Sequence, residues 1–140
     1  MDLEKQVIPT IKDYDALEID LKEIIKILDM RKSADLHLMR KLKIIHLMTE
    51  ICKKLSHCHK NEIKHLARMI EYSVKIINIF CSLKENRNYM LSTNRLITLI
   101  DLLNWCLNRS TQLFYGITFL PTLISILTLH IKHRVPFECQ

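Results

Sequence analysis

The sequence holds a single glycine, Gly116, among its 140 residues. Glycine makes up about 7% of an average protein, because hairpin turns and phosphate-binding loops depend on its positive φ angles and on close approach of the backbone. Here 49% of the residues are hydrophobic while glycine is almost missing. The composition therefore predicts an all-α protein whose helices are joined by short polar turns.

Apolar residues recur at helical spacing along most of the chain. Asp15 and Glu18 form an acidic capping box at the start of the first patterned stretch. Asn94 stands as a cap before a later stretch, and Pro121 suits the first turn of the last one. The patterns predict roughly five to six helices, over residues 16–31, 33–55, 62–82, part of 84–94, 95–108 and 120–134.

Residues 1–14 are interrupted by Pro9 and carry scattered charges, so we expect a lead-in segment there and a single helical domain over 15–140. The sequence ends without a polar capping helix, which is consistent with a fragment of a longer helical-repeat protein. Residues 96–103 match residues 120–127 at an offset of 24. Either true repetition or the chance likeness of two leucine- and isoleucine-rich helices explains this match.

Lysine and arginine number 21 against 15 acidic residues, so the net charge is +6. Such a surplus either favours anionic partners, among them acidic protein segments, nucleic acid and anionic lipid, or only keeps the domain in solution. Residues 22–64 hold many of these basic residues but no aromatic residue that could stack on bases. We therefore expect a protein or peptide partner, acidic if these charges contribute, and no specific nucleic-acid binding.

The five cysteines are irregularly spaced, and the first residues lack the basic and apolar regions of a secretory signal. Both features predict a reducing intracellular compartment, the cytoplasm or the nucleus. One cluster has the residue types that bind zinc, but its spacing differs from the usual Cys-x₂₋₄-Cys and His-x₃₋₅-His patterns. It comprises Cys52, His57, Cys58, His59 and His65. We accordingly predict neither a metal site nor a cofactor.

The stretch over residues 110–131 has no formally charged residue and is long enough to span a bilayer. It is interrupted by Gly116 and Pro121. One helical face also carries small polar residues that a lipid-bathed helix does not need, namely Thr118, Thr122, Ser125 and Thr128. A buried helix is therefore favoured, and a tail-anchored membrane protein with a cytosolic helical head is the alternative.

A polar segment that opens with Asn86 and Arg87 leads into the leucine-rich run over 96–103. This segment resembles the junction between the short second helix and the long third helix of an armadillo-type repeat. In that family an Asn-Arg pair opens the short helix, and a Leu-x-x-Leu-(Val/Ile)-x-Leu-Leu run packs the long helix into the stack.

The resemblance covers residues 60–140. Two departures from the family pattern are the offset of 24, which is shorter than the ~40 residues of armadillo or HEAT units, and Asn94, which replaces the usual turn glycine. The resemblance implies a stack of helices that binds a partner and has no activity of its own. An irregular helical bundle is the alternative architecture.

Catalytic motifs are missing from the sequence, including G-x-S-x-G, G-x-x-x-x-G-K-[ST], H-E-x-x-H and C-x-x-C. We therefore expect a non-enzymatic scaffold or adaptor. In this hypothesis the helices over 62–82, 95–108 and 120–134 form a groove that grips a peptide or an acidic partner. A small homo-oligomer, in which self-association completes the apolar faces, is a further hypothesis.

Four residues are the candidate partner contacts. Asn104 is chosen because a side-chain amide can hold a peptide backbone, and Trp105 because tryptophan is a frequent anchor at interfaces. The alternative for Trp105 is an ordinary place in the core. Asn86 and Arg87 complete the set, because they carry the resemblance.

Overall fold

The computed structural model describes residues 11–30, 32–54, 63–108 and 118–134. In these residues the chain forms seven helices and no strand, which confirms the all-α prediction. The helices are α2 (Ile11–Asp29), α3 (Ser33–Lys41), α4 (Ile44–Lys53), α5 (Ile63–Phe80), α6 (Lys84–Ser92), α7 (Arg95–Asn108) and α8 (Leu120–Arg134).

The single helix predicted over residues 33–55 is wrong, because the chain turns between α3 and α4. Lys43, with φ 57° and ψ 24°, lies in the left-handed region. A residue in that region cannot continue a right-handed helix. The apolar periodicity runs across this turn without a glycine or proline to mark it. The sequence pattern therefore concealed the break, and the number of helices exceeds the prediction.

The helix predicted over residues 16–31 also begins earlier than predicted, because α2 starts at Ile11, inside the expected lead-in over residues 1–14. Tyr14 is buried, and its ring stacks on the ring of His65 in α5 with the centroids 6.0 Å apart. This contact with α5 stabilises the helical conformation at Tyr14, and the local sequence contains no signal for it. Asp15 consequently lies within α2, and not at its N-cap.

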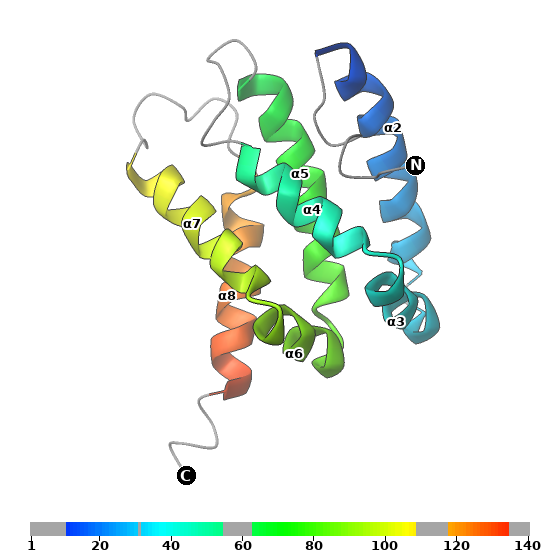
Figure 1. The fold of residues 1–140 in the computed structure, drawn as a ribbon, viewed down its shortest axis with the longest axis vertical. Helices are drawn as coiled ribbons and strands as arrows, with labels where there is room; N and C mark the ends of the chain where they lie inside the picture. The colour runs from blue at the N-terminus through cyan, green and yellow to red at the C-terminus, as the bar shows by residue number, and fades with distance from the viewer. Residues whose placement is uncertain (1–10, 31, 55–62, 109–117, 135–140) are drawn as a thin grey trace.

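Figure 1 shows the helices in three rows. The long helices α2, α5 and α8 lie side by side, with α2 packed on α5 and α5 packed on α8. In front of them α4 packs on α5, α7 packs on α8, and α4 and α7 contact each other. The short helices α3 and α6 form the third row at one end of the molecule.

Two parts of the chain repeat the same backbone pattern. The nine-residue helices α3 and α6 each follow an extended residue, Lys32 in one case and Leu83 in the other. Each is followed by a residue with positive φ, Lys43 at 57° and Asn94 at 58°, after which α4 and α7 begin. The two left-handed residues are 51 positions apart, from 43 to 94. Residues 96–103 and 120–127, in contrast, lie in the neighbouring helices α7 and α8.

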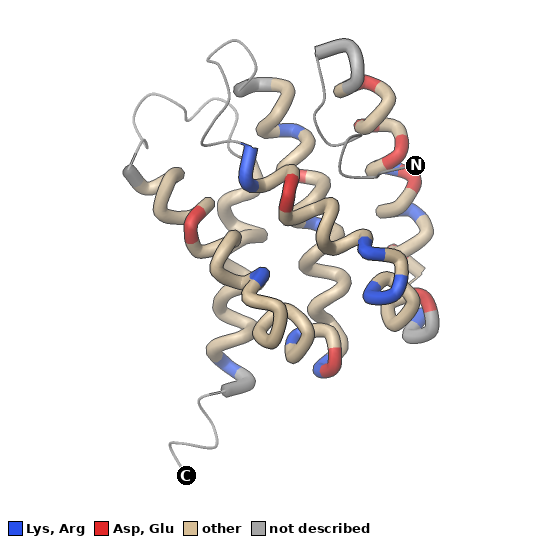
Figure 2. The backbone as a smooth tube through the Cα atoms, viewed as in Figure 1, with Lys and Arg blue, Asp and Glu red and all other residues tan. Residues whose placement is uncertain are grey.

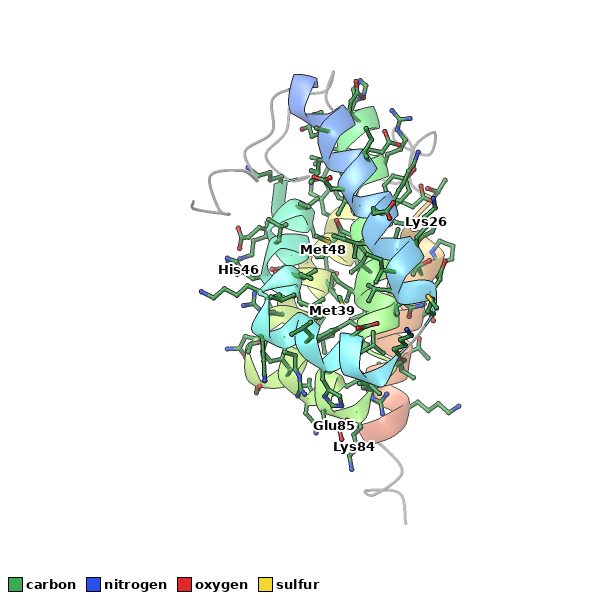
Figure 3. The ribbon with its side chains drawn as sticks, turned by 90° about the vertical axis from the view of Figure 1, so that its right-hand side faces the viewer. Lys26, Met39, His46, Met48, Lys84 and Glu85 are labelled. Carbon is green, nitrogen blue, oxygen red and sulfur yellow. The ribbon has the colours of Figure 1, made fainter. Side chains whose placement is uncertain are left out.

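The hydrophobic core lies between the three rows and is centred on α5. This helix contacts α2, α4 and α8, so it is buried on more than one side, as its wide apolar stripe predicts. Met39 and Met48 point into the interior from α3 and α4, whereas His46 lies at the edge (Figure 3). The largest fully buried side chains include Phe80, Phe119, Leu66, Met69, Ile70, Ile76 and Ile77.

Candidate partner-binding surface

Asn86 lies inside the fold, at the point where α3, α5 and α6 meet. Its side chain has 0% exposure. The Nδ2 amide donates hydrogen bonds to the carbonyl oxygens of Leu36, at 3.1 Å, and Phe80, at 2.9 Å. Both donors of this amide are therefore used within the protein. Asn86 joins three helices and, in this conformation, cannot reach a partner.

Arg87 stabilises the turn between α5 and α6. Its Nη1 donates to the carbonyl oxygens of Cys81, at 3.0 Å, and Ser82, at 3.3 Å. These residues follow the end of α5, where backbone carbonyls have no donor within the helix. The Asn-Arg pair noted in the sequence thus lies in the first turn of α6, and its side chains donate to carbonyl oxygens at the end of α5 and in the turn that follows it. It is not part of an open groove.

Asn104 and Trp105 lie on α7. Asn104 is exposed, whereas Trp105 is half-buried and packs against the core. Trp105 follows Leu96 by nine positions, which is about two and a half helical turns, so the two side chains point to opposite sides of the helix. Leu96 faces an open hollow beside α8. Trp105 therefore lies on the other side of α7, and neither candidate contributes to the described lining of that hollow.

The hollow lies between α7 and α8 and has a volume of about 390 Å³. Leu91, near the end of α6, also lines it. The described lining side chains are almost all apolar, and none carries a formal charge: Leu91, Leu96, Ile100, Leu103, Ile124, Leu127, Thr128, His130 and Ile131. A surface of this composition favours burial against apolar atoms of another molecule.

His130 is the titratable side chain in the described lining. It is buried, and its Nδ1 lies 2.8 Å from the carbonyl oxygen of Ile126, one turn earlier in α8. This arrangement fits an Nδ1–H group that donates to the carbonyl. This hydrogen bond fixes the orientation of the imidazole ring beside the hollow.

The same two helices also carry exposed apolar side chains. Of the ten large hydrophobic side chains that are exposed in the described part of the chain, five lie on α7 and α8: Ile97, Ile100, Leu107, Ile124 and Ile131. Figure 2 shows few charged positions along both helices. Those of α7 are Arg95 and Asp101, and those of α8 are Lys132 and Arg134 near its C-terminal end.

Basic residues gather at a different place, around the turn between α3 and α4 (Figure 2). Lys41 and Lys43 are exposed there, with Lys32 at the other end of α3. Arg40 contacts His37 within α3. If an acidic partner binds this protein, this turn offers the complementary charge, and the hollow does not.

The described cysteines offer no reactive thiol. Burial raises the pKa of Cys52 and of Cys81 to about 12 and that of Cys106 to about 11. Burial thus disfavours the thiolate, which is the form that attacks electrophiles and binds metal ions. Over the ranges that the structure describes, no three His, Cys, Asp or Glu residues are grouped to hold a metal ion. His57, Cys58 and His59 of the candidate cluster lie outside those ranges.

The proposed membrane span over residues 110–131 is described only from residue 118 onwards. Within the described helices, none combines the length and the apolar character required to cross a bilayer.

Comparisons of the chain with known protein families, with curated proteins and with solved structures found no match.

Proposed function

We propose that this protein is a non-enzymatic interaction module, a scaffold or adaptor, that binds a partner protein through the hollow between α7 and α8. The observation that carries this proposal is an open hollow of about 390 Å³ whose described lining has no formal charge. Continuous apolar surface costs free energy in water, and on folded proteins it commonly marks an interaction site. Burying it against a partner recovers about 25 cal/mol for each Å² removed from water.

The arrangement of the helices supports an armadillo-type stack as the scaffold. Each row contains helices of similar length that contact one another. The order of a short helix, a left-handed residue and a longer helix recurs 51 positions apart. In such stacks each unit contacts only its neighbours, and the last unit needs a polar outer face or a cover. The helices α7 and α8 belong to the last described unit, and their outer face is apolar.

The chemistry of the hollow favours a partner with apolar anchors over an acidic one. An acidic segment would find no cation among the described lining residues, and its own charges would lose hydration on entry. Asn104 is exposed on the same helix and remains available to a partner that extends beyond the hollow.

Capture of partners by wild-type and variant chains tests this proposal. Ile100→Asp and Ile124→Asp place a carboxylate in each wall of the hollow, while Ile19→Asp places one at an exposed isoleucine of α2. We expect the tagged wild-type chain and Ile19→Asp to retain the same proteins from a lysate of cells that produce it, by quantitative mass spectrometry. The two hollow variants should lose them. Equal capture by all four chains would refute the role of the hollow.

A further inference from the structure

The fold contains two similar units, the first with α3 and α4 and the second with α6 and α7. In the first unit, one side of α4 corresponds to the side of α7 that lines the hollow, and another helix covers it. Ile45, Thr49 and Cys52 lie on one side of this helix and are 0%, 1% and 2% exposed. That side faces α7, because Arg95 Nη1 donates to Thr49 Oγ1 at 3.3 Å. Cys106 of α7 also lies close enough to Cys52 to contribute to the raised pKa of its thiol. The apolar side of α4 is thus buried by a helix that lies along it.

In the second unit the corresponding side of α7 has no such cover within the described chain. Counting 51 positions from Ile45, Thr49 and Cys52 leads to residues 96, 100 and 103. Leu96, Ile100 and Leu103 all line the hollow, and Ile100 is 42% exposed. The same register that is covered on α4 is therefore open on α7.

We propose that an amphipathic α-helix of a partner protein occupies the hollow and lies along α7 as α7 lies along α4. This inference rests on the proposed function and specifies the kind of partner. A helix fits because it satisfies its own backbone hydrogen bonds. An extended peptide would bring unpaired N–H and C=O groups into an apolar hollow, each at a cost of about 1–3 kcal/mol.

A second copy of this chain is a poorer fit to the same surface. Two copies related by a twofold axis would place the same face of each against the other. A hollow set against a hollow leaves unfilled space, whose lining loses dispersion contacts. The side chains of a single helix form a ridge, which can enter the space between α7 and α8.

The contact between α7 and α4 indicates the pattern that the partner helix needs. The buried side chains of α7 are Leu99, Leu102 and Cys106, at positions i, i+3 and i+7, and this spacing places them on the same side of the helix as Arg95, which contacts α4. Arg95 adds a polar contact, because its Nη1 lies 3.1 Å from Nδ1 of His46. The residue 51 positions after His46 is Ile97, so the second unit has no counterpart for this contact. We therefore expect an uncharged contact face on the partner helix.

The test uses a synthetic peptide with the sequence of residues 96–108, with Cys106 replaced by valine, a fluorescein label and added terminal lysines. A control peptide carries lysine in place of Leu99 and Leu102. Fluorescence anisotropy follows each peptide as the full chain is added. We expect saturable binding of the first peptide with a Kd on the order of 10 μM, and no binding of the control. Because the contact is apolar, raising the salt from about 0.05 to about 0.5 M should change the Kd less than threefold.

Variants of the full chain locate the bound peptide. Ile100→Asp and Ile124→Asp should each weaken binding at least tenfold, an expectation based on a buried unpaired carboxylate, and Ile19→Asp should leave it unchanged. Circular dichroism checks that each variant is folded. Absence of binding to wild type, equal binding by the hollow variants, or binding of the control peptide would overturn the inference. A wild-type dimer that Ile100→Asp dissociates, measured by analytical ultracentrifugation, would overturn it in favour of a second copy.

The peptide test and the capture test can fail separately. If capture of cellular proteins requires Ile100 while the peptide does not bind, the hollow binds proteins but not a helix of this kind. The proposed function then stands and the inference about the helix is wrong. If neither depends on Ile100, both are wrong.

Discussion

Replacement of Asn86 by alanine should destabilise the fold by about 2 kcal/mol, a value that follows from its two hydrogen bonds. The amide donates to Phe80 O, one of the last four carbonyls of α5, which the helix itself leaves without a donor. Loss of that donor from a buried carbonyl costs about 1–3 kcal/mol. Loss of the second bond, to Leu36 O within α3, costs about 1 kcal/mol.

A smaller effect acts in the opposite direction. The Oδ1 of Asn86 is buried and has no hydrogen-bond partner in the described part of the protein. Alanine removes this oxygen, and relief of its desolvation recovers about 1 kcal/mol. The balance is the predicted loss of about 2 kcal/mol.

Urea unfolding followed by circular dichroism measures this loss, as a shift of the midpoint at constant slope. Asn88→Ala is the matched control, because Asn88 is exposed on the same helix and should stay within about 0.5 kcal/mol of wild type. Asn86→Asp keeps the shape but replaces the donating amide with an acceptor, so it should cost more than alanine. If Asn86→Ala were as stable as Asn88→Ala, the proposed bridge between α3, α5 and α6 would be refuted.

Two further predictions concern the turn between α3 and α4 and the buried thiols. Lys43→Gly should stabilise the protein by up to about 1 kcal/mol, because glycine adopts the left-handed region without strain. Lys75→Gly, within α5, should destabilise it by about 1 kcal/mol; urea unfolding measures both, and an equal loss in both would contradict the role of the turn. The raised pKa values, about 12 for Cys52 and Cys81 and about 11 for Cys106, apply to the folded state. These thiols therefore favour folding below the ordinary pKa of 9.0, and this contribution is lost as the pH rises towards the folded values. At about pH 8, iodoacetamide should label the three thiols in urea but not in the native protein, by mass spectrometry, and equal labelling rates would refute their burial.

Local patterns account for the parts of this fold that the sequence predicts correctly. The apolar spacing over residues 95–108 and 120–134 reproduces α7 and α8, and Pro121 lies in the first turn of α8. An α-helix has 3.6 residues per turn whatever it packs against, so the spacing of its apolar residues can be recognised from the sequence alone. The same reasoning explains why a chain with one glycine forms helices throughout its described residues.

The candidate site was predictable only in part. The sequence indicated a groove lined by parts of residues 62–82, 95–108 and 120–134, whereas the described lining of the hollow comes from α6, α7 and α8 and includes no residue of α5. The individual contact residues could not be predicted from the sequence. Asn86 has a polar amide that suits a partner, yet its place among three helices uses that amide internally. Trp105 lies on the side of α7 away from the hollow, and spacing within one helix cannot show which side a neighbour covers.

The sequence alone determined that this protein is helical, where most of its helices lie and which stripe of each is apolar, because these properties depend on neighbours within a few residues. Tertiary structure alone decided the left-handed turn at Lys43, the early start of α2 and the equivalence of α4 and α7. Met39 and Met90 are the only identical pair when residues 32–53 are compared with 83–104, so these two segments resemble each other in backbone geometry and not in sequence. Which apolar stripe is covered and which is left open depends on contacts between distant segments, and such contacts exist only once the chain has folded.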